Sequence, residues 1–225
     1  MENRSFFNRN LLLRALTSLV LIPIVLIISY NGGIVFKFTV VLMAVLMAFE
    51  WNGMTTKGNP PHPVLWRAIG SMYITVPCAS VLYITTQDQG SYIVMWLFIV
   101  VWVSDISAFF IGKLIGGPKL APKISPKKTW SGFLGTSVTA YILGIYSVDF
   151  FQSEYPKTLM FLTISLALYA QMGDLFESWI KRKFNTKDSG SVLPGHGGIL
   201  DRVDGIVVTA PKVAFVLMFY PHYIF

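Results

Sequence analysis

The stretch YIVMWLFIVVWVSD, residues 92–105, decides the fold because twelve consecutive apolar residues are followed by a serine and an acid. A helix needs about 20 mostly apolar residues to cross the hydrocarbon core of a bilayer. The apolar character extends over that length when the window is widened to residues 91–112. The sequence therefore predicts a transmembrane helix here, with Asp105 inside it.

Windows of the same kind recur along the whole chain. Of its 225 residues, 54% are hydrophobic and only 13% are charged, and the mean hydropathy of +0.60 lies far above that of soluble domains. No linker, low-complexity tract or repeat marks a second domain. We therefore expect an all-α, polytopic integral membrane protein with one domain over residues 1–225. It has about seven predicted transmembrane helices, at 11–30, 34–51, 67–86, 91–112, 131–151, 157–180 and 203–221.

The positive charges predict how these helices are oriented. The net charge is +7, and Lys and Arg gather before the first predicted helix and around the loops after the second, fourth and sixth. Short cytoplasmic loops are rich in Lys and Arg, so we expect the N-terminus in the cytoplasm and the C-terminus outside. The N-terminal segment has the basic and then apolar order of a signal peptide, but no clear cleavage site, which predicts an uncleaved first helix.

Several classes of chemistry are excluded by residues that the sequence lacks. Cys78 is the only cysteine and lies in an apolar run, so neither a disulfide framework nor a thiolate metal cluster can form. The hydrolase pattern GxSxG and the metal motif HExxH do not occur. The phosphotransferase pattern DGxxAR is also absent, although Asp204 and Gly205 begin one. Phosphoryl or nucleotidyl transfer remains, because it relies on positioning and charge neutralisation rather than on a covalent nucleophile.

Two predicted helices carry acids about two turns before a basic loop, Asp105 in the fourth and Asp174 in the sixth. An acid inside a membrane costs roughly 2.5–3.5 kcal/mol on the insertion scale, so it usually faces a polar cavity or a partner. We expect both acids at a similar depth in the cytoplasmic half. The alternative is that each acid pairs with a nearby lysine and only holds helices together.

The fourth loop, GKLIGGPKLAPKISPKKTWSG at residues 112–132, is rich in lysine and proline. Its prolines prevent a regular helix, which predicts an irregular segment from which the lysines project. Such a loop suits a polyanion, and we expect Lys127 and Lys128 to be among the lysines that bind it. Simple anchoring to anionic lipid is the alternative.

The sixth loop, SWIKRKFNTKDSGSVLPGHGGILDRVDG at residues 178–205, predicts a metal and phosphate site. Asp201 and Asp204 are three residues apart, so they share a face if a helix begins there. Together with Asp174 they would form an all-oxygen site, which favours Mg²⁺ over zinc. Mg²⁺ typically binds through one or two carboxylates plus substrate phosphates. The cations expected to complete the polyphosphate site are Lys181, Arg182 and Lys187.

The PGHGG segment of the same loop adds a possible phosphate cradle. Gly197 and Gly198 permit conformations in which successive N–H groups point into one concavity. His196 could hydrogen-bond a phosphate, act as an acid or base, or only fix the loop.

The sixth loop resembles, nearly position for position, the signature of the phosphatidate cytidylyltransferases (CDP-diacylglycerol synthases), S-x-x-K-R-x(4)-K-D-x(5)-P-x-H-G-G-x-x-D-R-x-D. The upstream segments QMGDLFES and SDISAFFIGKLIG, with PKISPKKTWSG, are also similar to that family. The resemblance covers residues 100–205, the expected catalytic part. The matching pattern is long and combines basic, acidic and glycine positions, so it is specific to the family.

This resemblance implies the Mg²⁺-dependent reaction of CTP with phosphatidic acid to give CDP-diacylglycerol and pyrophosphate, for phospholipid biosynthesis. It implies the inner membrane of a bacterium or a bacterial-type organelle, with the site facing the cytoplasm, and a homodimer. It places the metal on Asp174, Asp201 and Asp204. The other polar positions of the signature are Lys181, Arg182, Lys187, Asp188, His196 and Arg202.

Two positions depart from the family pattern, and two other functions stay open. Members commonly have Glu where Ser131 stands and Ser where Gly205 stands, so the roles of these positions are not implied. A CTP-dependent lipid kinase would bind a metal ion and the nucleotide phosphates through the same kinds of residue. A transporter of a phosphorylated solute would require inverted repeats, which the sequence does not display.

Overall fold

A computed structural model describes residues 9–56, 61–190 and 197–220. Each predicted transmembrane window coincides with one helix, so the prediction of an all-α fold is confirmed. The elements in chain order are α1 (Arg9–Asn31), α2 (Gly33–Thr56), α3 (Pro63–Ile84), α4 (Gly90–Ile115), β1 (Lys119–Ala121), β2 (Ser125–Thr129), α5 (Trp130–Phe151), α6 (Pro156–Lys183) and α7 (Leu200–Phe219).

Five of the described helices, α2 to α6, are long and apolar enough to cross a membrane. In α1 the apolar segment Leu19–Asn31 is shorter than these five helices. The helix α7 is less apolar because four charged residues, at positions 201, 202, 204 and 212, lie among its 20 residues. The count of about seven spans and the orientation of the N-terminus therefore stay predictions.

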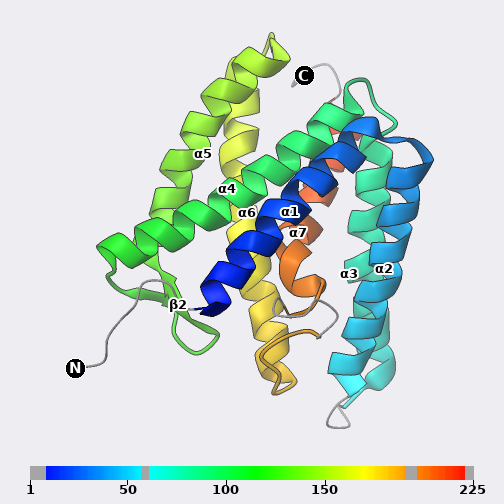
Figure 1. Ribbon diagram of the computed structural model, residues 1–225, viewed down its shortest axis with the longest axis vertical. Coiled ribbons are helices and arrows are strands. Elements are labelled where there is room, and N and C mark those ends of the chain that lie inside the picture. The colour runs from blue at the N-terminus through cyan, green and yellow to red at the C-terminus, as the bar shows by residue number, and fades with distance from the viewer. Residues whose placement is uncertain (1–8, 57–60, 191–196, 221–225) are drawn as a thin grey trace.

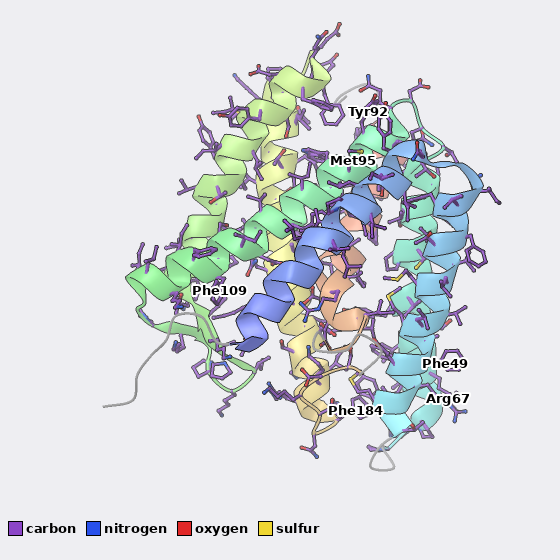
Figure 2. All side chains as sticks on the ribbon, in the orientation of Figure 1. Phe49, Arg67, Tyr92, Met95, Phe109 and Phe184 are labelled. Atoms are coloured by element: carbon purple, nitrogen blue, oxygen red, sulfur yellow. The ribbon has the colours of Figure 1, made fainter. Side chains whose placement is uncertain are left out.

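The helices form two groups, and α7 packs between them against α3 and α6 (Figure 1). Figure 1 shows α5 on one side and the α2–α3 pair on the other, with α4 and α1 crossing obliquely between them. The helix α6 packs against α5 and α7, and α3 packs against α7. In Figure 2, Tyr92 lies at one end of α4, and Phe109 lies toward the other end, near the β1–β2 hairpin. Arg67 and Phe184 lie at the end of the molecule opposite Tyr92.

Two buried clusters hold this arrangement together. The larger one surrounds α4, α6 and α7 and includes Leu97 and Leu166, which are fully buried. The smaller one joins α2 and α3 to the end of α6 and the start of α7, through Trp51, Phe184 and Leu200. The smaller cluster therefore fixes the start of α7, and the larger one holds its middle and its end.

The loop at residues 112–132 differs from its prediction as an irregular segment. It contains an antiparallel strand pair in which Lys119 faces Thr129 and Ala121 faces Ser125. The prolines do exclude a helix, but a two-stranded hairpin has free edges where proline is tolerated. At its base, the Ser131 hydroxyl donates a hydrogen bond to the carbonyl of Gly116. Ser131 thus ties the end of α4 to the start of α5.

Two glycines let α7 approach its neighbours closely. A Cβ atom on Gly205 would lie 2.7 Å from Cγ1 of Val101 in α4 and 3.2 Å from Cβ of Ala170 in α6. A Cβ atom on Gly173 of α6 would lie 2.7 Å from the carbonyl oxygen of Asp204. Any side chain at these positions would push α7 away, which gives the departure at Gly205 a packing role.

The Gly173→Ala substitution is expected to destabilise the protein, because the carbonyl oxygen of Asp204, 2.7 Å from the added Cβ atom, is backbone and cannot turn aside. Overpacking of this kind typically costs about 1–3 kcal/mol. Gly53→Ala is the matched control, since a Cβ atom there has nothing within 4 Å. Thermal unfolding in detergent would measure both. Equal midpoints for the two variants would contradict close packing of α6 on α7.

Candidate active site

A cavity of about 1270 Å³ runs from the helix bundle to the hairpin. This volume exceeds the roughly 300–1,000 Å³ of ordinary small-molecule sites. One part of its wall is apolar and comes from α1 to α4, and the other part is charged and comes from the hairpin, α4, α6 and α7. The apolar wall includes Val25, Phe36, Val40, Met43, Met47 and Val81. The predicted site residues that line the cavity are Lys127, Lys128, Asp174, Asp201, Arg202 and Asp204, together with Asp105.

Lys128, in β2, connects Asp105 of α4 with Asp174 of α6. Its Nζ lies 2.7 Å from Oδ2 of Asp174 and donates a hydrogen bond of 3.0 Å to Oε1 of Gln171. The amide of Gln171 in turn donates to Oδ1 of Asp105 over 2.9 Å. Asp105 and Asp174 therefore lie in one network, in agreement with the prediction of a similar depth. Asp174 does pair with a nearby lysine, as the alternative expects, and this lysine comes from the hairpin and lines the cavity.

Lys181 and Asp201 form a second, more buried pair. The Lys181 Nζ lies 2.5 Å from Oδ1 of Asp201, and their side chains are 11% and 10% exposed. The other oxygen of Asp201 accepts hydrogen bonds from the N–H groups of Ser189 and Gly198 and from the Ser189 hydroxyl, at 2.9–3.0 Å. Burial alone would raise the pKa of Asp201, which precedes the apolar part of α7, but these donors outweigh it and hold the pKa below its usual value.

Glu50 binds the same turn from the opposite side. It lies in α2, is 5% exposed, and accepts hydrogen bonds from the N–H groups of Ile199 (2.8 Å) and Leu200 (2.9 Å). The Ser189 hydroxyl lies 3.3 Å from its Oε2. The N–H groups of three successive residues at the start of α7 therefore donate to two carboxylates. Gly198 donates to Asp201, and Ile199 and Leu200 donate to Glu50.

Glu177 and Tyr73 are buried polar groups near the acids. Neither carboxylate oxygen of Glu177 nor the hydroxyl of Tyr73 has a hydrogen-bond partner among the described residues. The Lys181 Nζ lies 3.5 Å from Oε2 of Glu177, so this carboxylate has one ion-pair contact. Asp174, Glu177 and Asp204 are close enough for their negative charges to interact. These three acids therefore lie close together at the charged end of the bundle, where Lys128 pairs with Asp174 and Lys181 with Glu177.

The remaining predicted residues lie around this centre. Arg182 is exposed and donates to the carbonyls of Ile124 in the hairpin and Thr186, at 3.3 Å and 3.1 Å. Lys187 and Asp188 are exposed on the turn after α6. The N–H of Gly198 is not free to bind phosphate in this arrangement, because Asp201 accepts it. Gly197 lies beside Asp201 with φ near 80°, a conformation that glycine adopts easily. His196 lies outside the described residues.

The predicted metal triad is only partly assembled. In residues 9–56, 61–190 and 197–220, no group of three or more His, Cys, Asp or Glu side chains is arranged to hold a metal ion. Asp201 is separated from the set because Lys181 and the 197–200 turn occupy its oxygens. The buried carboxylate of Glu177 and the nearby Asp174 and Asp204 still fit a cation chemically, and Mg²⁺ needs only one or two carboxylates when phosphates complete its ligands.

Sequence reasoning missed Gln171, Glu177, Ser189 and above all Glu50 as parts of this site. Glu177 carried a signal, since it lies one turn after Asp174 in an apolar helix. Glu50 carried one as well, because it is a lone acid at the end of the apolar window 34–51. Nothing in the sequence indicates that the Glu50 carboxylate meets residues 199–200.

Comparison with known proteins identifies the family of the chain. Residues 57–220 match the model of the "Cytidylyltransferase family". The chain is 38% identical over 214 residues to a phosphatidate cytidylyltransferase of Rickettsia bellii, covering 92% of this chain and 90% of that protein. It is 36% identical to the protein of the same name from Rickettsia felis, covering 92% of each chain. For that of Brucella abortus biovar 1 the identity is 38%, covering 85% of this chain and 68% of the relative. The chain therefore belongs to the cytidylyltransferase family.

Proposed function

We propose that this chain is a phosphatidate cytidylyltransferase. The enzyme transfers CMP from CTP to phosphatidate and forms CDP-diacylglycerol and pyrophosphate. The observation that carries this function is the cavity, whose apolar wall suits acyl chains and whose charged end suits phosphates. A soluble nucleotide and a lipid with two acyl chains can react only where such surfaces meet.

In the reaction, an oxygen of the phosphatidate phosphate attacks the α-phosphorus of CTP. A new oxygen–phosphorus bond forms, the bond between the α-phosphorus and the bridging oxygen breaks, and pyrophosphate leaves with that electron pair. A phosphate monoester is mostly ionised at neutral pH, so no strong base is required. Catalysis then consists of holding the two phosphates in line and offsetting their charge.

The residues divide these tasks by position. Lys128, Lys127 and Arg202 line the charged end of the cavity and offset the charge of the phosphates. Asp174 and Asp204 would hold Mg²⁺, which supplies further neutralisation when bound. Asp201 fixes Lys181 and the start of α7. Arg182, Lys187, Asp188, His196, Gly197 and Gly198 remain candidates for contacts with the nucleotide.

The membrane context extends the proposal. The chain acts as a single domain in a bacterial inner membrane, with about seven spans, a cytoplasmic N-terminus and the charged end of the cavity on the cytoplasmic side. The alternation of basic loops supports this orientation. The family resemblance supports a homodimer.

A transfer assay separates this function from the two alternatives. The purified protein in detergent should release pyrophosphate from CTP when phosphatidate is added, and diacylglycerol should not replace it. A lipid kinase would instead release CDP. A transporter would consume no CTP. Release of CDP, or no phosphatidate-dependent turnover, would contradict the proposal.

A further inference from the structure

Glu50 is a buried acid whose carboxylate is fully engaged by another part of the chain. Phe49, the residue before it, points outward from α2 (Figure 2) and is 69% exposed, whereas Glu50 is 5% exposed. A carboxylate in this position is costly unless donors compensate it. Ile199 and Leu200 donate their N–H groups to it, and the N-terminus of a helix also favours a negative charge.

The Ser189 hydroxyl links Glu50 to Asp201. It lies 3.3 Å from Oε2 of Glu50 and 3.0 Å from Oδ2 of Asp201. A hydroxyl has one proton, so it can donate to only one of the two carboxylates at a time. The position of Glu50 therefore constrains the serine, the turn and Asp201 together.

The space around the carboxylate is filled by the chain itself. A Cβ atom on Gly190 would lie 2.7 Å from Oε1 of Glu50, and one on Gly198 would lie 2.6 Å from its Oε2. The two glycines thus allow the turn to close around the carboxylate. Met47, one helical turn earlier in α2, lines the apolar wall of the cavity. The same helix therefore contacts the apolar wall of the cavity and the turn that precedes Asp201 and Asp204.

We propose that Glu50 is a positioning residue for the transfer reaction. It fixes the first turn of α7, and through it the orientation of Asp201 and Asp204 at the charged end of the cavity. This proposal rests on the proposed function. It adds a residue from α2 to a site whose other acids lie in α4, α6 and α7 and in the turn after α6.

The test compares Glu50→Gln with Glu154→Gln, an exposed glutamate in the turn before α6. Glutamine keeps the shape but presents an NH₂ group toward one of the two N–H donors. We expect kcat per folded molecule to fall about 10–100-fold, as for other residues that orient ligands. The KM for phosphatidate should stay unchanged, because the apolar wall is intact. Glu50→Asp keeps the charge and should recover part of the rate. Glu154→Gln should behave as the unmodified protein.

Hydrogen exchange at residues 198–201 provides a readout that does not depend on activity. The amides of Gly198, Ile199 and Leu200 should exchange faster in Glu50→Gln and be unchanged in Glu154→Gln. Ser189→Ala, which keeps both N–H bonds to Glu50, should lower kcat by less than Glu50→Gln does. A Glu50→Gln protein with normal kcat per folded molecule would overturn the proposal. If the unmodified protein lacks transfer activity, the proposed function fails. Unchanged hydrogen exchange at residues 198–201 in Glu50→Gln would separately refute the positioning role of Glu50.

Discussion

Asp201→Asn is expected to remove nearly all transfer activity, by at least about 100-fold. Asparagine lacks the charge that pairs with Lys181, whose side chain is only 11% exposed. It also turns an NH₂ group toward either Lys181 or the N–H donors of Ser189 and Gly198. The turn that sets the start of α7 would therefore lose its anchor at the charged end of the cavity.

The same substitution is expected to lower stability, because it breaks a buried ion pair. Removing one partner of such a pair typically costs about 3–5 kcal/mol. Lys181 keeps its contact with Glu177, 3.5 Å away, in this variant, so we expect a loss at the lower end of that range. Initial rates normalised to folded protein, with thermal unfolding, would separate the two effects. Asp149→Asn, an exposed acid in α5, is the control. Normal rates in Asp201→Asn would exclude Asp201 from the site.

Lys128→Met should have the second largest effect, a loss of about 10²–10³-fold in kcat. Lys128 is the cation that contacts Asp174, and it reaches Asp105 through Gln171. Without it, both acids face the cavity with less positive charge nearby, and incoming phosphates meet a more negative surface. Steady-state kinetics with varied CTP would measure the loss.

Lys123→Met is the matched control for Lys128. Lys123 belongs to the same hairpin but is exposed and does not line the cavity. Both variants remove one positive charge, so a general effect of charge on substrate attraction would lower both rates equally. Equal losses would contradict a local role for Lys128.

The helices were predictable because their signal is local. A window of apolar residues specifies a spanning helix whatever surrounds it, and Asp105 and Asp174 were recognisable because acids are costly in such windows. The β1–β2 hairpin was not, because its strands are three and five residues long and contain a proline. Its regularity depends on pairing and on the Ser131 contact at its base rather than on propensity.

The candidate site was predictable as a set of residues but not as a set of contacts. Lys128, Asp174, Asp201 and Asp204 do line one cavity. The sequence suggested that Asp201 joins the metal acids, whereas Lys181 and the 197–200 turn occupy it. The spacing of residues along the chain predicts which of them share a helix face. It does not predict which donor from a distant part of the chain binds a given carboxylate. The contact of Glu50 with Ile199 joins residues 149 positions apart, which no local pattern can indicate.

Tracing the α-phosphate of CTP tests the central claim most directly. The purified protein would be incubated in detergent with phosphatidate and CTP labelled at either the α- or the γ-phosphate, with and without Mg²⁺. The account predicts that the α-label enters the lipid product, that the γ-label leaves in pyrophosphate, and that both events require Mg²⁺. An α-label that stays in CDP while the γ-label enters the lipid would contradict it.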